Sequence, residues 1–423
     1  MLRYLVSSAG VIHGEFPLRL KYLKINIWDL NFILTMVGFG FFTTFVDSSA
    51  GSIAYRGFAL LVAWVCLLKS KLRIPDDKYI KAFLFAFAYI TLQVTINFYL
   101  IDHTAVLFSN SRLQSTLYNF GIVGIPMLAF LCGIKKIQWE TALTVLLMLM
   151  VFTVGVGIKN TFSSEMTADG RFNMNARVST LQFGDNAAYL VLLSTAMLMR
   201  SKVVKNKVFL RVLSCASIGL GVWGVAKAGS RGPLVGMCAG LMFLFVCLSK
   251  KAKTAVITTF TVVLFGGFVS FKALETFAPA LVQRFTETVE DGDLGNRDIL
   301  FEQALSKFSE GLNWLIGTNP YYLEIKEFSS CHNMYLEMLI GTGVIGFAIF
   351  LYSTLGVGSL GLVKHKLLPK TPEVSFLFAL LFFNLARGMS GIMVIANPIL
   401  AFSVIGAAFF IKYAKRKRTY ECM

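Results

Sequence analysis

The stretch TALTVLLMLMVFTVGVGI, residues 141–158, decides the fold class of this chain. It contains no charged residue, and wound as a helix it would present apolar side chains on every side. A run of this length crosses a hydrocarbon core about 30 Å thick as one helix. A soluble helix would instead keep one polar face. This segment is therefore predicted to span a membrane.

Comparable apolar runs recur along the whole chain. Hydrophobic residues make up 56% of the sequence and charged residues 15%, whereas soluble domains contain about 25% charged residues. The mean hydropathy is +0.67. We expect an all-α polytopic membrane protein in which residues 1–423 form a single integral membrane domain of about twelve transmembrane helices. These helices are expected near residues 28–46, 53–68, 82–100, 113–132, 141–158, 186–199, 212–228, 233–248, 255–271, 334–353, 374–392 and 398–411.

The positions of lysine and arginine predict the orientation. With the N-terminus inside, the segments between the spans that face the cytoplasm hold 27 of the 40 basic residues, as the positive-inside rule requires. Both termini are thus expected in the cytoplasm of a bacterial inner membrane. The first 27 residues are mixed and basic, so no cleavable signal peptide is expected. The net charge of +17 fits basic loops facing anionic lipid, and no nucleic-acid partner is expected.

Two predicted outward loops are large, a smaller one over 159–185 and a larger one over 272–333. Within the larger loop, residues 296–309 (NRDILFEQALSKFS) place apolar side chains at helical spacing. This pattern predicts an amphipathic helix, which can lie on the membrane surface. The sequence shows no internal repeat, so it gives no support to an inverted-repeat transporter.

Metal and disulfide chemistry receive little support. Cys331 is the one cysteine predicted to face outward, so it has no intramolecular disulfide partner. It is expected to react with a membrane-impermeant thiol reagent unless it is buried. Asp291 and Asp293 form a DGD sequence typical of a turn. Asp47, Asp102 and His103 are of types that bind metals, but no spacing links them, and no metal or other cofactor is expected.

His332 is the histidine with the most telling position. It lies where the larger loop re-enters the membrane, and the next residue, Asn333, is a candidate N-cap of the following helix. A helix N-terminus at the membrane surface favours an anion, and a histidine there can act as a general base. The alternative is a surface histidine that only caps the helix.

Three arginines lie near predicted membrane entry points on the outward side. Arg231 is in the tight turn AKAGSRGPLVG together with Ser230, Arg297 opens the amphipathic helix, and Arg177 precedes a re-entering helix. Guanidinium groups bind the oxygens of a pyrophosphate in a bidentate manner, and backbone N–H groups of the turn could join them. The alternative for Arg231 is a side chain that extends to the lipid surface from a helix end.

Three segments in this order and topology resemble the O-antigen ligase and O-antigen polymerase superfamily. They are SRGPLVG (230–236), NRDILFEQAL (296–305) and CHNMYLEMLIGTGVIGF (331–347), with a weaker likeness in ARVSTLQFGDNAAYL (176–190). The last differs from the family in Gly184-Asp185-Asn186, where relatives often have Pro-Asn.

The resemblance implies a GT-C-like fold whose site is carried by the loop 272–333 and faces the periplasm. It also implies that a glycan is transferred from an undecaprenyl-diphosphate carrier to an acceptor hydroxyl without a metal. In the family, a loop histidine and arginines that match Arg231 and Arg297 are tied to activity, so His332 would be the catalytic base and these arginines would bind the pyrophosphate. From their positions in the sequence, Arg177 is expected to join the arginines, and Asn333 and Ser230 to support the site. The acceptor would be lipid A core for a ligase or another lipid-linked repeat unit for a polymerase. A protein O-oligosaccharyltransferase and a lipid-linked-oligosaccharide flippase or transporter are the alternatives.

Overall fold

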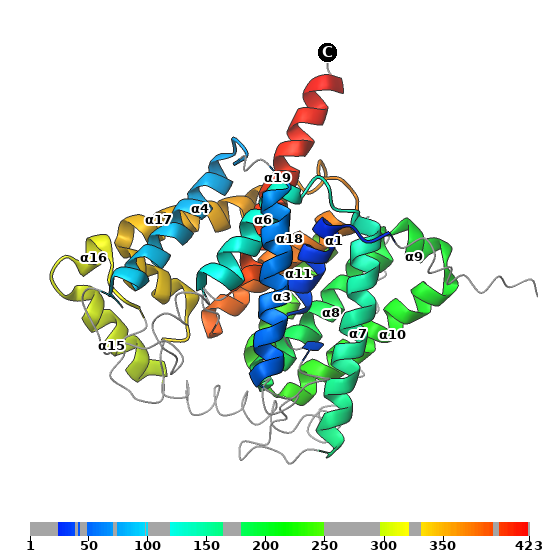
Figure 1. The fold of residues 1–423 in the computed structure, drawn as a ribbon, viewed down its shortest axis with the longest axis horizontal. Coiled ribbons are helices and arrows are strands. Elements are labelled where there is room, and N and C mark those ends of the chain that lie inside the picture. The colour runs from blue at the N-terminus through cyan, green and yellow to red at the C-terminus, as the bar shows by residue number, and fades with distance from the viewer. Residues whose placement is uncertain are drawn as a thin grey trace, which may run out of the picture.

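The computed structural model describes residues 24–38, 41–42, 49–70, 74–97, 99, 119–163, 179–248, 297–320, 331–391 and 397–421. All regular structure in these ranges is helical, as the apolar runs predicted (Figure 1). The elements that position the site are α1 (Ile27–Val37), α3 (Ser49–Leu68), α4 (Lys78–Ile96), the π-helix η4 (Asn119–Gly124), α6 (Ile125–Gly133), α7 (Trp139–Ser163), α8 (Thr180–Arg200), α9 (Lys202–Asn206), α10 (Val208–Ala228), α11 (Arg231–Val246), α15 (Arg297–Ser309), α16 (Asn313–Ile316), α17 (Met334–Val363), α18 (Pro372–Arg387), the 3₁₀ helix η5 (Gly388–Ser390) and α19 (Pro398–Glu421).

Six helices within the described ranges are long and apolar enough to cross a membrane. They are the spans Gly51–Leu68, Lys78–Ile96, Trp139–Thr161, Val208–Ala228, Met334–Val363 and Pro372–Ser390. Four shorter apolar helices accompany them, at Ile27–Val37, Gly121–Gly133, Arg231–Val246 and Pro398–Ala414. The chain is therefore an α-helical polytopic membrane protein. The span expected at 255–271 lies outside the described residues.

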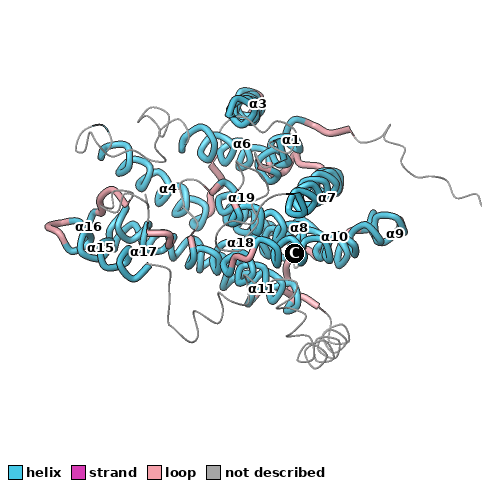
Figure 2. The backbone as a smooth tube through the Cα atoms, turned by 90° about the horizontal axis from the view of Figure 1, so that it is seen from below, coloured by secondary structure: helices cyan, strands magenta, loops and turns pink. Residues whose placement is uncertain are grey.

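Helix α8 lies at the centre of one half of the bundle. It packs against α7, α10, α11 and α18 (Figure 2), and most of its residues are buried. Small residues permit this close packing. A Cβ on Gly221 of α10 would come within 2.7 Å of the carbonyl oxygen of Ala187 in α8. The predicted span at 186–199 is thus an interior helix of the bundle.

Helix α17 is broken at Gly343, where φ is +64°. A side chain there would overlap the carbonyl group of Leu315, so only glycine allows the approach of α16. The backbone N–H of Thr318 donates to the carbonyl oxygen of Ile340 at 2.7 Å, and Tyr89 of α4 donates from its hydroxyl to the carbonyl oxygen of Ile316 at 2.6 Å. These bonds fix the segment that follows α15 against α4 and α17.

The amphipathic helix predicted within 296–309 is confirmed as α15. Leu300 and Ala304 are buried, and Ala304 forms a small cluster with Cys331 and Ile340 beside α17. Cys331 is 0% exposed, and burial raises the pKa of its thiol to about 12. Cys331 was expected to react with a thiol reagent unless it is buried, and it is buried, so no reaction is now expected.

Candidate functional site

A cavity of about 360 Å³ opens among the helices of the bundle. Its walls come from α1, α3, η4, α6, α8 and α19, together with the turn at His332 and the end of α18. Its lining residues include both polar and apolar side chains. The polar set is Tyr55, Arg56, Ser179, Gln182, Asp185, Asn186, His332, Arg387 and Asn397, and the larger apolar members include Leu34, Met36, Val37, Leu60, Ile122, Leu181 and Ile399.

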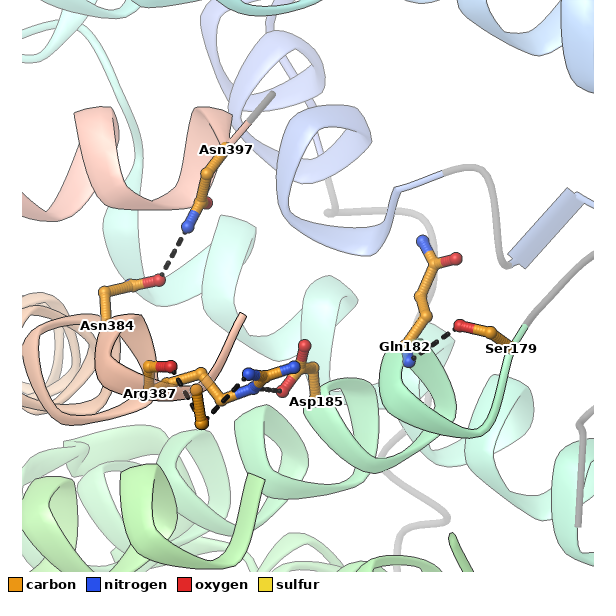
Figure 3. A network of polar contacts seen from close by, with 7 residues as sticks. Ser179, Gln182, Asp185, Asn384, Arg387 and Asn397 are labelled. Carbon is orange, nitrogen blue, oxygen red and sulfur yellow. Dashed lines mark hydrogen bonds and ion pairs between the residues drawn. The ribbon is translucent and has the colours of Figure 1, made fainter. Parts of the chain in front are cut away.

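An ion pair between α18 and α8 lines part of the cavity (Figure 3). Arg387 is the last residue of α18, and its side chain is 1% exposed. It donates from Nε to Oδ1 of Asp185 at 2.9 Å and from Nη1 to the hydroxyl of Ser390 in η5 at 3.1 Å. A buried guanidinium is tolerated only when it is paired and hydrogen-bonded in this way. The side chain of Asp185 is 18% exposed and lines the cavity.

The SRG turn packs directly against this ion pair. Gly229 ends α10 in the left-handed conformation, with φ of +60°, and Ser230 is the buried N-cap of α11. A Cβ on Gly232 would come within 2.8 Å of Nη1 of Arg387, and one on Gly236 within 3.1 Å of its Cβ. The glycines of SRGPLVG therefore make room for Arg387. Arg231 starts α11 and is partly buried, and it is not among the residues that line the cavity.

His332 reaches the cavity through the cap of α17. Asn333 is confirmed as the N-cap, since its Oδ1 accepts from the backbone N–H groups of Tyr335 at 3.0 Å and Leu336 at 3.2 Å. The hydroxyl of Tyr335 donates to the carbonyl oxygen of Leu385 at 2.7 Å. This bond ties the start of α17 to the end of α18, which carries Arg387. His332 and Arg387 therefore line the same cavity.

The backbone of His332 is in the left-handed region, with φ of +49°. Among the described residues it is the only non-glycine residue with a positive φ. Such a conformation costs roughly 1–3 kcal/mol, and residues that keep it cluster at functional sites. The unusual backbone of His332 therefore adds to the case that this turn is part of a functional site.

A second polar pair links α18 to the start of α19. Asn397, at the start of α19, donates from Nδ2 to Oδ1 of Asn384 at 2.9 Å (Figure 3). Its own Oδ1 accepts from the backbone N–H of Leu400 at 2.9 Å and so caps α19. The pair joins α18 to α19 inside the bundle, where a lost hydrogen bond is costly.

The structure places some of the predicted site residues and leaves others outside its description. His332, Asn333, Ser230 and Arg231 are described as above. Arg297 is the first residue of α15, and its side chain is outside the described set, as is all of Arg177. The metal alternatives also lie outside it: Asp47, Asp102, His103, Asp291 and Asp293. Within the residues that are described, no group of three or more His, Cys, Asp or Glu side chains could hold a metal ion.

Sequence reasoning did not single out Arg56, Asp185 and Arg387, which line the cavity. A signal for two of them was present. Arg56 and Arg387 lie within apolar runs predicted to span the membrane, where an ionisable residue is expensive and is most often functional. Asp185 is one residue before the predicted span at 186–199, so only its proximity to Arg387 in space reveals its role.

Residues 216–351 match the model of a family described as O-antigen ligase. This segment, about a third of the chain, is similar to the O-antigen ligase family. This match includes the SRG turn, α15 and the segment from Cys331 to Phe347, and it confirms the resemblance to the O-antigen ligase and polymerase superfamily. Asp185 and Arg387 lie outside the matched residues. A comparison with curated proteins found no match.

The match supports an enzyme, since proteins described as O-antigen ligases join a lipid-linked glycan to an acceptor, and the apolar helices support a membrane protein. The residues that line the cavity are of the types needed to bind a lipid-linked glycan. The polar lining residues offer hydrogen-bonding groups to sugars or phosphates, and the apolar lining residues offer contacts to a lipid chain.

Proposed function

We propose that this protein transfers an undecaprenyl-diphosphate-linked O-antigen, or a related polysaccharide, to an acceptor hydroxyl at the periplasmic face of the bacterial inner membrane. The observation that carries the proposal is the position of His332. It belongs to the segment that matches the O-antigen ligase family, and it lines a cavity together with both polar and apolar side chains.

The proposed reaction is an inverting displacement at the anomeric carbon. His332 takes the proton of the acceptor hydroxyl as its oxygen forms the new glycosidic bond. The bond between the anomeric carbon and the phosphate oxygen of the carrier breaks, and its electron pair leaves with undecaprenyl diphosphate. Inversion places the base and the leaving group on opposite faces of the sugar. His332 is therefore assigned to the acceptor side.

Arginine side chains are proposed to stabilise the leaving diphosphate. The candidates predicted from the sequence are Arg231, Arg297 and Arg177. Arg56 of α3 is a further candidate because it lines the cavity. Each guanidinium can donate two parallel hydrogen bonds to phosphate oxygens as negative charge develops. Arg387 is assigned a different role, because Asp185 and Ser390 already accept its hydrogen bonds.

The membrane topology is part of the same proposal. A twelve-helix, GT-C-like arrangement with both termini in the cytoplasm puts loops 159–185 and 272–333 in the periplasm, where lipid-linked glycans are presented. The base and the guanidinium clamp account for the chemistry without a metal ion. Addition of EDTA is expected to leave transfer unchanged, and inhibition that Mg²⁺ or Mn²⁺ reverses would point to Asp47, Asp102 and His103 instead.

A reconstituted assay tests the function. The purified protein in proteoliposomes is given a lipid-linked repeat unit as donor, with lipid A core or further lipid-linked repeat units as separate acceptors. Extension of lipid A core identifies a ligase, and growth of lipid-linked chains identifies a polymerase. Movement of donor across the bilayer with no new glycosidic bond would contradict the proposal and favour a flippase.

A further inference from the structure

One face of α8 lines the cavity with a continuous set of polar groups. Gln182, Asp185 and Asn186 are spaced at i, i+3 and i+4, which places them side by side on a helix. Tyr189 follows at the next position of the same face, and all four line the cavity. Tyr189 packs edge-on against Phe383 of α18, with ring centroids 4.8 Å apart, so this face is held firmly against its neighbour.

Asn186 is the most informative member of this face. It is 7% exposed, and its Nδ2 has no hydrogen-bond partner in the part of the chain that the structure describes. Buried amide donors in proteins nearly always have a partner, because an unmade hydrogen bond is costly. Asn186 is one of the residues that line the cavity, so a ligand group bound there can supply the missing partner.

Asp185 presents an acceptor beside this donor. The ion pair with Arg387 uses Oδ1, and Figure 3 draws no contact from the other carboxylate oxygen to the labelled residues. The side-chain amide of Gln182 extends toward the same side of α8 in that view. Because Arg387 fixes the carboxylate, its free oxygen is oriented before any ligand enters.

We infer that Gln182, Asp185 and Asn186 form a subsite that binds the hydroxyl groups of the acceptor sugar. Carboxylate and amide groups together accept from and donate to neighbouring hydroxyls, which both donate and accept. A negatively charged carboxylate disfavours the diphosphate of the donor. His332 lines the same cavity, and the proposed reaction requires the acceptor hydroxyl to reach it. The inference rests on the proposed function and assigns acceptor recognition to α8.

The subsite also gives a reason for acceptor specificity. A site with fixed hydrogen-bonding groups rejects analogues that lack the matching hydroxyl, because its own polar groups are then left unpaired. The residues of α8 lie outside the segment that matches the family. The acceptor preference of this chain is therefore expected to depend on α8.

The test is the variant Asn186→Leu, which replaces the amide by an apolar side chain of similar shape. Because Nδ2 has no partner among the described residues, the change removes no hydrogen bond of the folded protein. Ser194→Ala is the matched control. Ser194 is on the same helix, is 0% exposed and also has an unpartnered oxygen, but it is not among the cavity-lining residues.

The measurement is steady-state transfer in proteoliposomes, with the lipid-linked repeat unit as donor and the acceptor that the wild-type protein uses. Asn186→Leu is expected to raise the acceptor KM roughly tenfold, the loss of about one hydrogen bond. The donor KM and the thermal unfolding temperature are expected to stay at the wild-type values. The Ser194→Ala control is expected to match the wild type in every readout.

Three results separate the possible failures. A wild-type acceptor KM in Asn186→Leu would overturn the subsite while leaving the proposed function intact. A raised donor KM with an unchanged acceptor KM would also overturn it, because the face would then bind the donor. A wild-type protein that joins no glycan to either acceptor would contradict the proposed function, and the subsite would be rejected with it.

Discussion

Arg387 at the end of α18 donates from Nε to Oδ1 of Asp185 in α8 at 2.9 Å, across 202 positions of the chain. The two residues lie in separate apolar segments, and their contact joins the two helices beside the cavity. The Arg387 side chain is 1% exposed and that of Asp185 is 18% exposed. The ion pair therefore links α8 to α18 and fixes the carboxylate of Asp185, a residue that lines the cavity.

Breaking this ion pair from the acidic side is expected to be destabilising. Asp185→Leu leaves the guanidinium of Arg387 buried without its counter-charge, which costs about 3–5 kcal/mol for a buried pair. The double variant Asp185→Leu, Arg387→Met removes both charges and is expected to be more stable than Asp185→Leu alone. Thermal unfolding in detergent measures both. A double variant less stable than the single one would show that the two residues do not stabilise each other.

Gly232 is expected to tolerate no side chain. A Cβ there would come within 2.5 Å of Oγ of Ser390 and 2.8 Å of Nη1 of Arg387. Gly232→Ala should therefore destabilise the protein by about 1–3 kcal/mol through overpacking. Gly219→Ala in α10 is the control, because a Cβ there meets nothing within 4 Å, and alanine should be neutral or stabilising by about 0.5–1 kcal/mol. Equal unfolding temperatures for the two variants would refute the close packing around Arg387.

The fold class followed from hydropathy, because a helix that is apolar on all sides has no stable place in water. Runs such as 141–158 and 334–353 were recognisable for that reason, and α7 and α17 confirm them. The break of α17 at Gly343 was not predicted. It depends on the approach of Leu315, which lies on another element and leaves no local signal beyond one glycine among many.

The candidate site was partly predictable. His332 and the Asn333 cap could be identified from one local segment, since capping depends on residues that are neighbours in sequence. The pairing of Asp185 with Arg387 joins distant segments, and a single sequence contains no spacing that encodes it. Arg387 was visible as a charge in an apolar run, a costly position that is a signal for function, but it was not predicted as a site residue.

The predicted periplasmic side of α15 can be tested by cysteine labelling. Cys331 is buried, and its raised pKa of about 12 keeps the thiol protonated near neutral pH. It is expected not to react with a membrane-impermeant maleimide in intact spheroplasts. Ser306 in α15 is exposed, so Ser306→Cys is expected to react. Labelling of that variant only after the membrane is permeabilised would place α15 in the cytoplasm and contradict the topology.

The proposed diphosphate clamp predicts that lysine cannot replace arginine. Arg56→Lys and Arg231→Lys each keep the charge but lose the planar fork that binds two phosphate oxygens. Each variant is expected to lose roughly 1.5–3 kcal/mol of transition-state binding, measured from kcat/KM with varied donor. Full activity of Arg231→Lys would identify Arg231 as an anchor at the membrane surface. Full activity of Arg56→Lys would remove Arg56 from the clamp.

The role of His332 must be separated from the strain of its backbone. Its φ of +49° is unfavourable for alanine but freely available to glycine, and asparagine tolerates it better than most residues. A loss of activity in His332→Ala could therefore combine the missing imidazole with a disturbed turn. His332→Gly and His332→Asn remove the imidazole while sparing the turn, and both are expected to keep the wild-type unfolding temperature or exceed it.

The most direct test of the proposed mechanism is the rate of glycan transfer by His332→Gly in proteoliposomes, compared with the wild type at saturating donor and acceptor. If His332 is the general base, the rate falls by about 10²–10⁴-fold although the protein remains folded. Wild-type turnover in His332→Gly would contradict the assignment of His332 as the base that activates the acceptor hydroxyl.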